Sequence, residues 1–264
     1  MIICFRTLER IKKLYLYRRN LWDMALAQLK AKYVGSILGI AWAVINPLLI
    51  ASVITFVFSH IFRIEIKNFS LFVLSGIFPW MFFSYALSEA TFSILSQQSI
   101  LRQFNVPREI LPLASVLSNF LNFLIGWVVV LPLFLFFKPA IILFLPLLMF
   151  VLLLILVFTC GLSLIFSVLN VFLRDLSNLL GVLLMFWLWV TPVFYSIEMI
   201  PRRFQWVIRF NPLTPYIIYC RAVLVEGRVP SFLLWTQILL WAFVSLMMGL
   251  LIFSRLESRI LKRI

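Results

Sequence analysis

The chain has 264 residues, of which 64% are hydrophobic and only 12% are charged, and its formal net charge is +14. A soluble globular chain is about 45–50% apolar and about 25% charged, so this composition argues against a soluble enzyme, a disordered chain and a disulfide-stapled secreted domain. Charge-free runs long enough to cross a bilayer as a helix, about 20 residues, recur along the sequence. They predict an all-α integral membrane protein.

The first segment, residues 1–35, is basic and amphipathic. Apolar residues recur at helical spacing from Ile11 to Leu29. Four of the basic residues between and after them are Arg18, Arg19, Lys30 and Lys32. This pattern predicts a helix that lies along the inner membrane surface; the alternative is a simple topology anchor. A signal peptide carries its positive charge before its apolar core, and here the charge follows, so we expect a retained, cytoplasmic N-terminus.

Six membrane spans are predicted within residues 36–253. They lie in Ser36–Phe62, Phe69–Phe92, Leu113–Phe137, Pro139–Leu173, Leu176–Ser196 and Phe232–Phe253. Pro47 predicts a kink in the first span, and Pro192 predicts an interruption of the fifth, because proline removes a backbone hydrogen bond. The run Pro139–Leu173 is too long for one crossing, so we expect part of it at the interface.

Two polar stretches separate the spans. The inner loop 93–112 is broken by Pro107 and Pro112, and the outer segment 197–231 holds five arginines. Within the outer segment, Phe210–Cys220 is apolar but too short to cross a bilayer, so it is predicted to be re-entrant or interfacial. Residues 254–264 form a basic tail.

Six spans place both termini on one side. With the termini inside, fifteen lysines and arginines lie on inner segments and eight on outer ones, as the positive-inside rule predicts. The same rule accounts for the net charge, so no nucleic-acid partner is expected.

The chain lacks the residues of several kinds of chemistry. None of its glycines begins a GxxxxGK[ST] phosphate-binding loop, so ATP hydrolysis is not expected here. His60 is the single histidine and the three cysteines form no CxxC pair, so neither a metal nor any other cofactor is predicted. The carboxylates fall at span ends or in loops, which argues against ion coupling. A transport function would therefore take its energy from a partner.

Aromatic residues are dense in the spans. They are Trp42, Phe78, Trp80, Phe82, Phe83, Tyr85, Phe186, Trp187, Trp189, Phe194 and Tyr195. Aromatic faces stack on the apolar faces of sugar rings, so one hypothesis is a slippery passage for a carbohydrate polymer. The alternative is plain packing, with some rings in an interfacial belt.

Several motifs occur in order along residues 26–257. They are Lys32-Tyr33 with Ser36, Leu38-Gly39, Trp42 and Pro47; Ser75-Gly76-Ile77-Phe78-Pro79-Trp80; Val106-Pro107-Arg108-Glu109-Ile110-Leu111-Pro112; Leu169-Asn170-Val171-Phe172-Leu173-Arg174-Asp175-Leu176; Thr191-Pro192-Val193-Phe194-Tyr195; and Asn211-Pro212-Leu213. Together they resemble polysaccharide-exporting ABC transporter permeases of the Wzm/TagG family, most closely the O-antigen branch.

The resemblance implies a homodimer of six-span subunits in the bacterial inner membrane, joined to two cytoplasmic ATPase subunits that hold ATP and Mg. The substrate would be a polyprenyl-diphosphate-linked polysaccharide, pushed to the periplasm between the two permeases. Residues 12–32 would form a gate helix, residues 97–110 a coupling helix, and residues 197–224 short outer gate helices.

The same resemblance assigns roles to named residues. The ATPase-coupling loop would comprise Arg102, Asn105, Val106, Pro107, Arg108 and Glu109. The outer gate would include Arg202, Arg203, Arg209, Asn211 and Pro212. Arg18, Arg19, Lys30 and Lys32 would attract the diphosphate of the lipid carrier, or else anchor the helix on lipid headgroups.

Three other functions remain open at this point. The first is an exporter permease for a teichoic acid or a capsular polysaccharide in place of O-antigen. A membrane-embedded transferase acting on lipid-linked sugars is a rival class, although it would need an acid/base or metal cluster that the sequence does not suggest. A passive scaffold for glycan assembly is the third.

Overall fold

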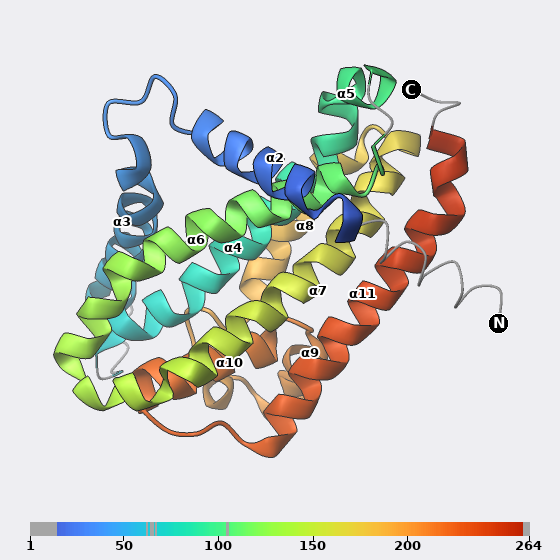
Figure 1. Ribbon diagram of the computed structural model, residues 1–264. Helices are drawn as coiled ribbons and strands as arrows, with labels where there is room; N and C mark the ends of the chain where they lie inside the picture. The colour runs from blue at the N-terminus through green and yellow to red at the C-terminus, as the bar shows by residue number, and fades with distance from the viewer. Residues whose placement is uncertain (1–14, 62, 64–65, 67, 104–105, 261–264) are drawn as a thin grey trace.

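The computed structural model describes residues 15–61, 63, 66, 68–103 and 106–260, with the side chains of residues 100–102 and 258 left undescribed. Every regular element in this part of the chain is a helix (Figure 1). A helix satisfies its backbone hydrogen bonds within one segment, which a bilayer interior demands. The prediction of an all-α membrane protein is confirmed.

The described helices are α-helices, together with short 3-10 and π helices that are labelled η. In chain order they are α2 (Arg18–Ala31), η1 (Gly39–Ala41), α3 (Trp42–Phe56), η2 (Val57–Ile61), α4 (Phe69–Ser96), α5 (Gln98–Gln103), α6 (Ile110–Phe137), η3 (Pro139–Phe144), α7 (Leu145–Phe172), α8 (Leu176–Val190), η4 (Ile197–Met199), η5 (Arg202–Phe204), α9 (Gln205–Phe210), α10 (Thr214–Arg221), η6 (Ala222–Glu226) and α11 (Phe232–Ile260).

Five helical stretches in the described residues are long and apolar enough to cross a membrane. They are Gly39–Ile61, Phe69–Ser96, Ile110–Phe137, Pro139–Phe172 and Phe232–Glu257. The predicted fifth span is shorter, because α8 has 15 residues and ends at Val190, where Thr191 takes an extended conformation before Pro192. The count of six spans therefore stays a prediction, although α8 is apolar from Leu179 to its end.

The boundaries of other predicted elements shift for local reasons. The inner loop is shorter than residues 93–112, because α4 continues to Ser96 and α6 begins at Ile110. Pro112 lies in the first turn of α6, where proline removes no helical hydrogen bond. The long apolar run divides after Phe144, since residues 139–144 form a separate 3-10 helix ahead of α7.

Helix α4 is the centre of the molecule. It packs against α3, α6, α7, α8 and α10, and most of its apolar residues are buried. The closest helix crossing joins α7 to α11, where a Cβ at Gly161 would lie 2.2 Å from the carbonyl carbon of Ser245 and one at Gly249 would lie 2.3 Å from the oxygen of Gly161. Two facing glycines let these backbones touch.

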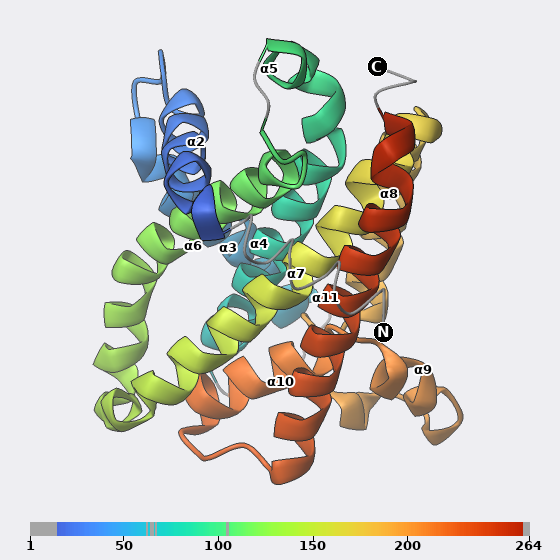
Figure 2. The same cartoon turned by 45° about the vertical axis from the view of Figure 1, so that its right-hand side comes forward.

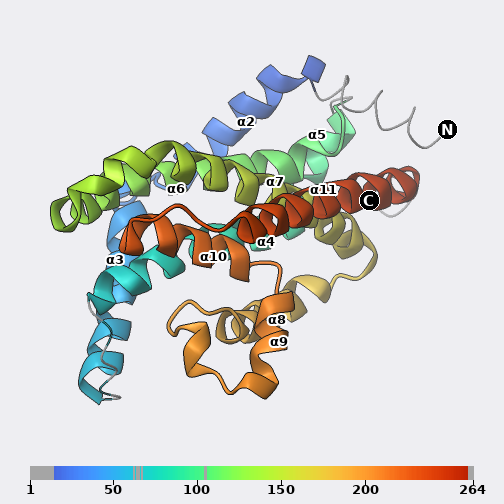
Figure 3. The ribbon, with the colours of Figure 1, turned by 90° about the horizontal axis from the view of Figure 1, so that it is seen from below.

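The chain gathers its connections at two ends. α2, α5 and the last turns of α11 lie at one end, at the top of Figure 1, and we call it the α5 end. α10 and the start of α11 lie at the opposite end, the α10 end (Figure 2). Seen from below (Figure 3), α8 and α9 lie on the side of the bundle away from α2 and α6.

Candidate functional site

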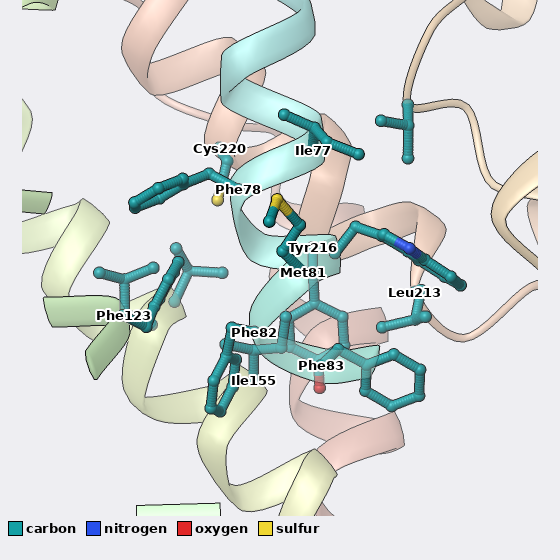
Figure 4. Close-up of a cluster of buried hydrophobic side chains, with 14 of the residues drawn as sticks. Ile77, Phe78, Met81, Phe82, Phe83, Phe123, Ile155, Leu213, Tyr216 and Cys220 are labelled. Atoms are coloured by element: carbon teal, nitrogen blue, oxygen red, sulfur yellow. The ribbon is translucent and has the colours of Figure 1, made fainter. Parts of the chain in front are cut away.

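Five of the eleven aromatic side chains predicted to line a passage are buried in the chain's own core. Phe78, Trp80, Phe82, Phe83 and Phe194 expose 4% of their surface or less. Figure 4 shows three of them, Phe78, Phe82 and Phe83, among side chains of neighbouring helices. Four of the five lie on α4, which is surrounded by other helices along most of its length. These rings pack the fold, and Phe78 and Phe82 also border a cavity.

The remaining six aromatic side chains keep accessible surface. Trp42, Tyr85, Phe186 and Trp189 are exposed, while Trp187 and Tyr195 are half-buried. They form two groups, because Trp42 and Tyr85 line a cavity near the α5 end and the other four lie on α8 or in the turn that follows it. The fold does not bring these groups into contact within one chain.

That cavity, the inner cavity, has a volume of about 370 Å³. It lies between α3 and the residues that follow α2 on one side and α4 and α6 on the other. Its lining comprises Lys32, Tyr33, Trp42, Ala43, Asn46, Pro47, Phe78, Met81, Phe82, Tyr85, Glu89, Asn119, Asn122 and Phe123. Composition alone did not reveal it, because its polar residues come from three separate helices and the connection after α2.

A hydrogen-bonded network of three side chains forms the polar wall of the inner cavity. Lys32 Nζ donates to Glu89 Oε1 at 2.8 Å and to Asn119 Oδ1 at 2.7 Å. Asn119 Nδ2 in turn donates to Glu89 Oε2 at 2.7 Å. The network ties the end of α2 to α4 and α6, and it neutralises the ammonium of Lys32, which was predicted to attract a diphosphate.

Tyr33 supplies a second link from the same connection. Its hydroxyl donates to Asn122 Oδ1 on α6. Burial raises the pKa of the Tyr33 hydroxyl from its usual value, with the hydrogen bond to Asn122 opposing the shift and the charge of Glu89 adding to it. The hydroxyl therefore keeps its proton at neutral pH and stays a donor.

The other basic residues of the predicted gate helix point elsewhere. Arg18, Arg19 and Lys30 are exposed on α2, and Arg18 Nη1 donates to the Tyr15 carbonyl at 3.0 Å. The apolar face of the helix, with Ala25 and Leu29 buried, packs against α6. The amphipathic helix is observed within the predicted range, over residues 18–31.

The predicted coupling loop lies at the α5 end (Figure 1). Arg102 is in α5, but its side chain and the whole of Asn105 lie outside the described residues. Val106 and Pro107 are half-buried, while Glu109 is buried at the start of α6. Arg108 Nη1 donates to the Glu257 carbonyl at 2.6 Å and lies 3.9 Å from that residue's carboxylate. This loop is therefore attached to the end of α11.

Asn211 is the best-connected residue of the predicted outer gate. Its Oδ1 accepts hydrogen bonds from Trp187 Nε1 at 2.8 Å and from the Leu213 N–H at 3.0 Å. Its Nδ2 donates to Thr191 Oγ1 at 2.9 Å. Asn211 thus joins the end of α8 to the start of α10.

The other predicted gate residues surround this contact. Arg202, Arg203 and Arg209 are exposed, and Pro212 is half-buried beside Asn211. The apolar piece Phe210–Cys220 includes most of α10, a buried helix of eight residues. Its re-entrant or interfacial placement stays a prediction.

Arg221 is a residue that the sequence reasoning did not single out. Its side chain is buried. Its Nη2 donates hydrogen bonds to the carbonyls of Pro192 at 2.9 Å and Val193 at 3.1 Å. Its guanidinium carbon lies 3.5 Å from the centroid of the Phe72 ring. Burial lowers the pKa of Arg221 to about 10, with the charge of Glu226 opposing the shift, so the group stays cationic at neutral pH. The sequence did carry a signal for this residue, because an arginine that ends a short apolar segment must find polar partners if it is buried.

The model of one transporter family matches residues 19–225, described as "ABC-2 type transporter". This match covers most of the chain, from the first turn of α2 to beyond the end of α10. The chain belongs to the ABC-2 type transporter family.

Curated relatives of this ABC-2 chain match over nearly its whole length. Two O-antigen export system permease proteins RfbA from Klebsiella pneumoniae are 34% and 35% identical, each over 88% of this chain and 89% of its own length. An O-antigen export system permease protein RfbA from Myxococcus xanthus is 30% identical over 84% of this chain and 86% of its own. The sequence-based assignment to polysaccharide-exporting permeases is confirmed.

Proposed function

We propose that this chain is the membrane-spanning permease subunit of an ATP-driven exporter that moves O-antigen from the cytoplasm to the periplasm. The observation that carries the proposal is the match to three O-antigen export permeases over 84–88% of the chain. A match of that length includes both ends of the helix bundle, so it concerns the whole permease and not one shared motif.

The expected partners are two copies of a cytoplasmic ATPase subunit. Membership of the ABC-2 family supports an ATPase partnership. The α5 end supplies a candidate docking surface, because α5 extends beyond α4 and the following residues are held against α11 by Arg108. A movement imposed on this loop would pass directly to α4, α6 and α11, since all three meet there.

A homodimer is supported by the surface of α8. Only Leu180 and Leu184 are buried on this helix, while large apolar side chains such as Val182, Met185 and Phe186 are exposed around it. A helix that is apolar on all sides needs cover on all sides. Lipid would cover one face, and a second copy would cover the other, leaving Phe186 and Trp189 near a passage between the two chains.

The substrate proposed is a polyprenyl-diphosphate-linked polysaccharide in the bacterial inner membrane. Arg18, Arg19 and Lys30 are the exposed cations of α2 that remain available to a diphosphate or to anionic headgroups. Lys32 is not available to a diphosphate, because its ammonium donates hydrogen bonds to Glu89 and Asn119.

Deletion and complementation in the native host test this function. Deleting the gene should remove O-antigen from the cell surface while lipid-linked polymer accumulates inside, and the wild-type gene should restore display. The measurement is an immunoblot of surface and inner-membrane fractions. Unchanged surface O-antigen would refute the proposal, and accumulation of a teichoic acid or capsular polymer would reassign the substrate.

A further inference from the structure

The inner cavity has the size and the lining of a ligand site. Its volume of about 370 Å³ lies within the range of about 300–1,000 Å³ typical of small-molecule sites. We propose that the inner cavity binds one neutral sugar unit of the exported polymer. The inference rests on the proposed function, because the polymer is the source of that sugar.

The charges at the cavity favour a neutral ligand. Lys32 Nζ lies 2.8 Å from a Glu89 carboxylate oxygen, so the pair carries no net charge. An anion approaching Lys32 would also approach the Glu89 carboxylate, and breaking the pair to admit it would leave a carboxylate without its cation. A diphosphate is therefore a poor occupant, whereas an uncharged hydroxyl group suits either member of the pair.

The cavity wall also offers hydrogen-bonding groups that the described part of the chain leaves unused. The Asn46 amide and the Tyr85 hydroxyl make no hydrogen bond to any described residue, and Asn122 uses only its Oδ1, toward Tyr33. Carboxamides and phenols both donate and accept. Sugar hydroxyls do the same, so these three groups match a polyhydroxylated ring.

Aromatic and apolar side chains complete the lining. Trp42 is 40% exposed and Tyr85 is 46% exposed, and both border the cavity beside the buried ring of Phe82. A flat aromatic face against the C–H face of a sugar ring, with polar groups at its edge, is the arrangement that amphipathic aromatics favour.

Tyr33 places this site next to an apolar pocket. The pocket has a volume of about 420 Å³ and is lined by Leu26, Leu29, Lys30, Tyr33, Val34 and Ile40. Tyr33 therefore separates a polar cavity from an apolar one at the same end of the molecule. A sugar unit attached to a lipid would find surfaces for both parts.

A cysteine-protection experiment tests the site with the natural polymer. Asn46→Cys is made in a background where Cys4, Cys160 and Cys220 are replaced by serine, and Asp175→Cys, an exposed position at the α5 end outside the cavity lining, serves as the matched control. Permeabilised membranes are prepared with the ATPase partner present, from cells that make the polymer and from cells blocked in its first sugar transfer. Alkylation by a maleimide is then timed.

We expect Asn46→Cys to react several-fold more slowly in membranes that contain the polymer, and Asp175→Cys to react equally in both. Adding Trp42→Leu should remove the protection, while Phe243→Leu, an exposed aromatic residue on α11 outside the cavity, should leave it. Equal rates at Asn46→Cys in the two membranes would overturn the proposal. Protection of Asn46→Cys by added inorganic diphosphate in the polymer-free membranes would also overturn it.

The wild-type gene separates a failure of this inference from a failure of the proposed function. If the wild-type gene restores surface O-antigen to the deletion strain while Asn46→Cys is never protected, the sugar site is refuted and export stands. If deletion leaves surface O-antigen unchanged, the proposed function itself is refuted.

Discussion

The indole Nε1 of Trp187 donates a hydrogen bond to Asn211 Oδ1 across 2.8 Å, and this bond joins the last turn of α8 to the segment that leads into α10. Asn211 also donates a hydrogen bond to Thr191 Oγ1 and accepts one from the Leu213 N–H. The turn at residues 191–195 is thus held from two sides, because Arg221 binds its carbonyls from α10.

Replacing Asn211 should loosen the outer segment. Asn211→Leu removes hydrogen bonds to four groups, because Asn211 Nδ2 also donates to the Val190 carbonyl at 3.4 Å. Each buried polar group left unpaired costs about 1–3 kcal/mol. We expect faster proteolysis of residues 191–213 in membranes and reduced export. Asn178→Leu, at an exposed asparagine in the first turn of α8, is the control and should change neither; equal proteolysis of Asn211→Leu and the wild type would show that the contact is dispensable.

The crossing of α7 and α11 should tolerate no side chain at Gly161. A Cβ there would overlap the Ser245 backbone at 2.2 Å, whereas a Cβ at Gly181 meets nothing within 4 Å. Gly161→Ala should therefore destabilise the protein by about 1–3 kcal/mol, the usual cost of overpacking. Thermal unfolding in detergent measures the difference, with Gly181→Ala as the matched variant, and equal melting temperatures for the two would contradict the packing.

Arg108 should couple the α5 end to α11. Arg108→Ala removes a charge-assisted bond to the Glu257 carbonyl, worth about 1.5–3 kcal/mol. We expect normal membrane insertion but weaker transport for each ATP hydrolysed by the assembled transporter. Arg255→Ala, at an exposed arginine on α11, is the control, and an Arg108→Ala transporter with wild-type coupling would remove this role.

The orientation in the membrane can be tested by thiol labelling. Arg203 and Asp175 are both exposed, Arg203 in the outer segment and Asp175 in the turn before α8. In intact spheroplasts an impermeant maleimide should label Arg203→Cys and not Asp175→Cys, and inverted vesicles should give the reverse. Labelling of both from one side would contradict the six-span topology.

The exposed face of α8 should lie close to a second copy. Phe186→Cys in the cysteine-free background should form a dimer on treatment with a short bismaleimide, because its side chain is exposed and needs cover. Phe243→Cys, an equally exposed position on α11, is the comparison. A dimer band with Phe243→Cys alone would place the interface on α11 instead.

The chain's class, its long helices and its motifs were evident from the sequence, because bilayer crossing imposes a length and an apolar composition that can be read locally. The end of α8 at Val190 was also predictable, because Pro192 interrupts the helix there. The short apolar piece Phe210–Cys220 likewise predicted a short helix in the region of α10.

Which aromatic side chains are buried, and which charged groups pair, was decided by the tertiary structure. Phe83 and Phe186 are both aromatic residues within apolar runs, yet one is buried and the other is exposed, because α4 is surrounded by helices and α8 lies at the edge. Lys32 and Glu89 are 57 residues apart, so only the packing of α2 against the bundle could show that the lysine is neutralised. A side chain's hydropathy shows whether it avoids water, and the surrounding helices decide whether it meets lipid, a second chain or the core.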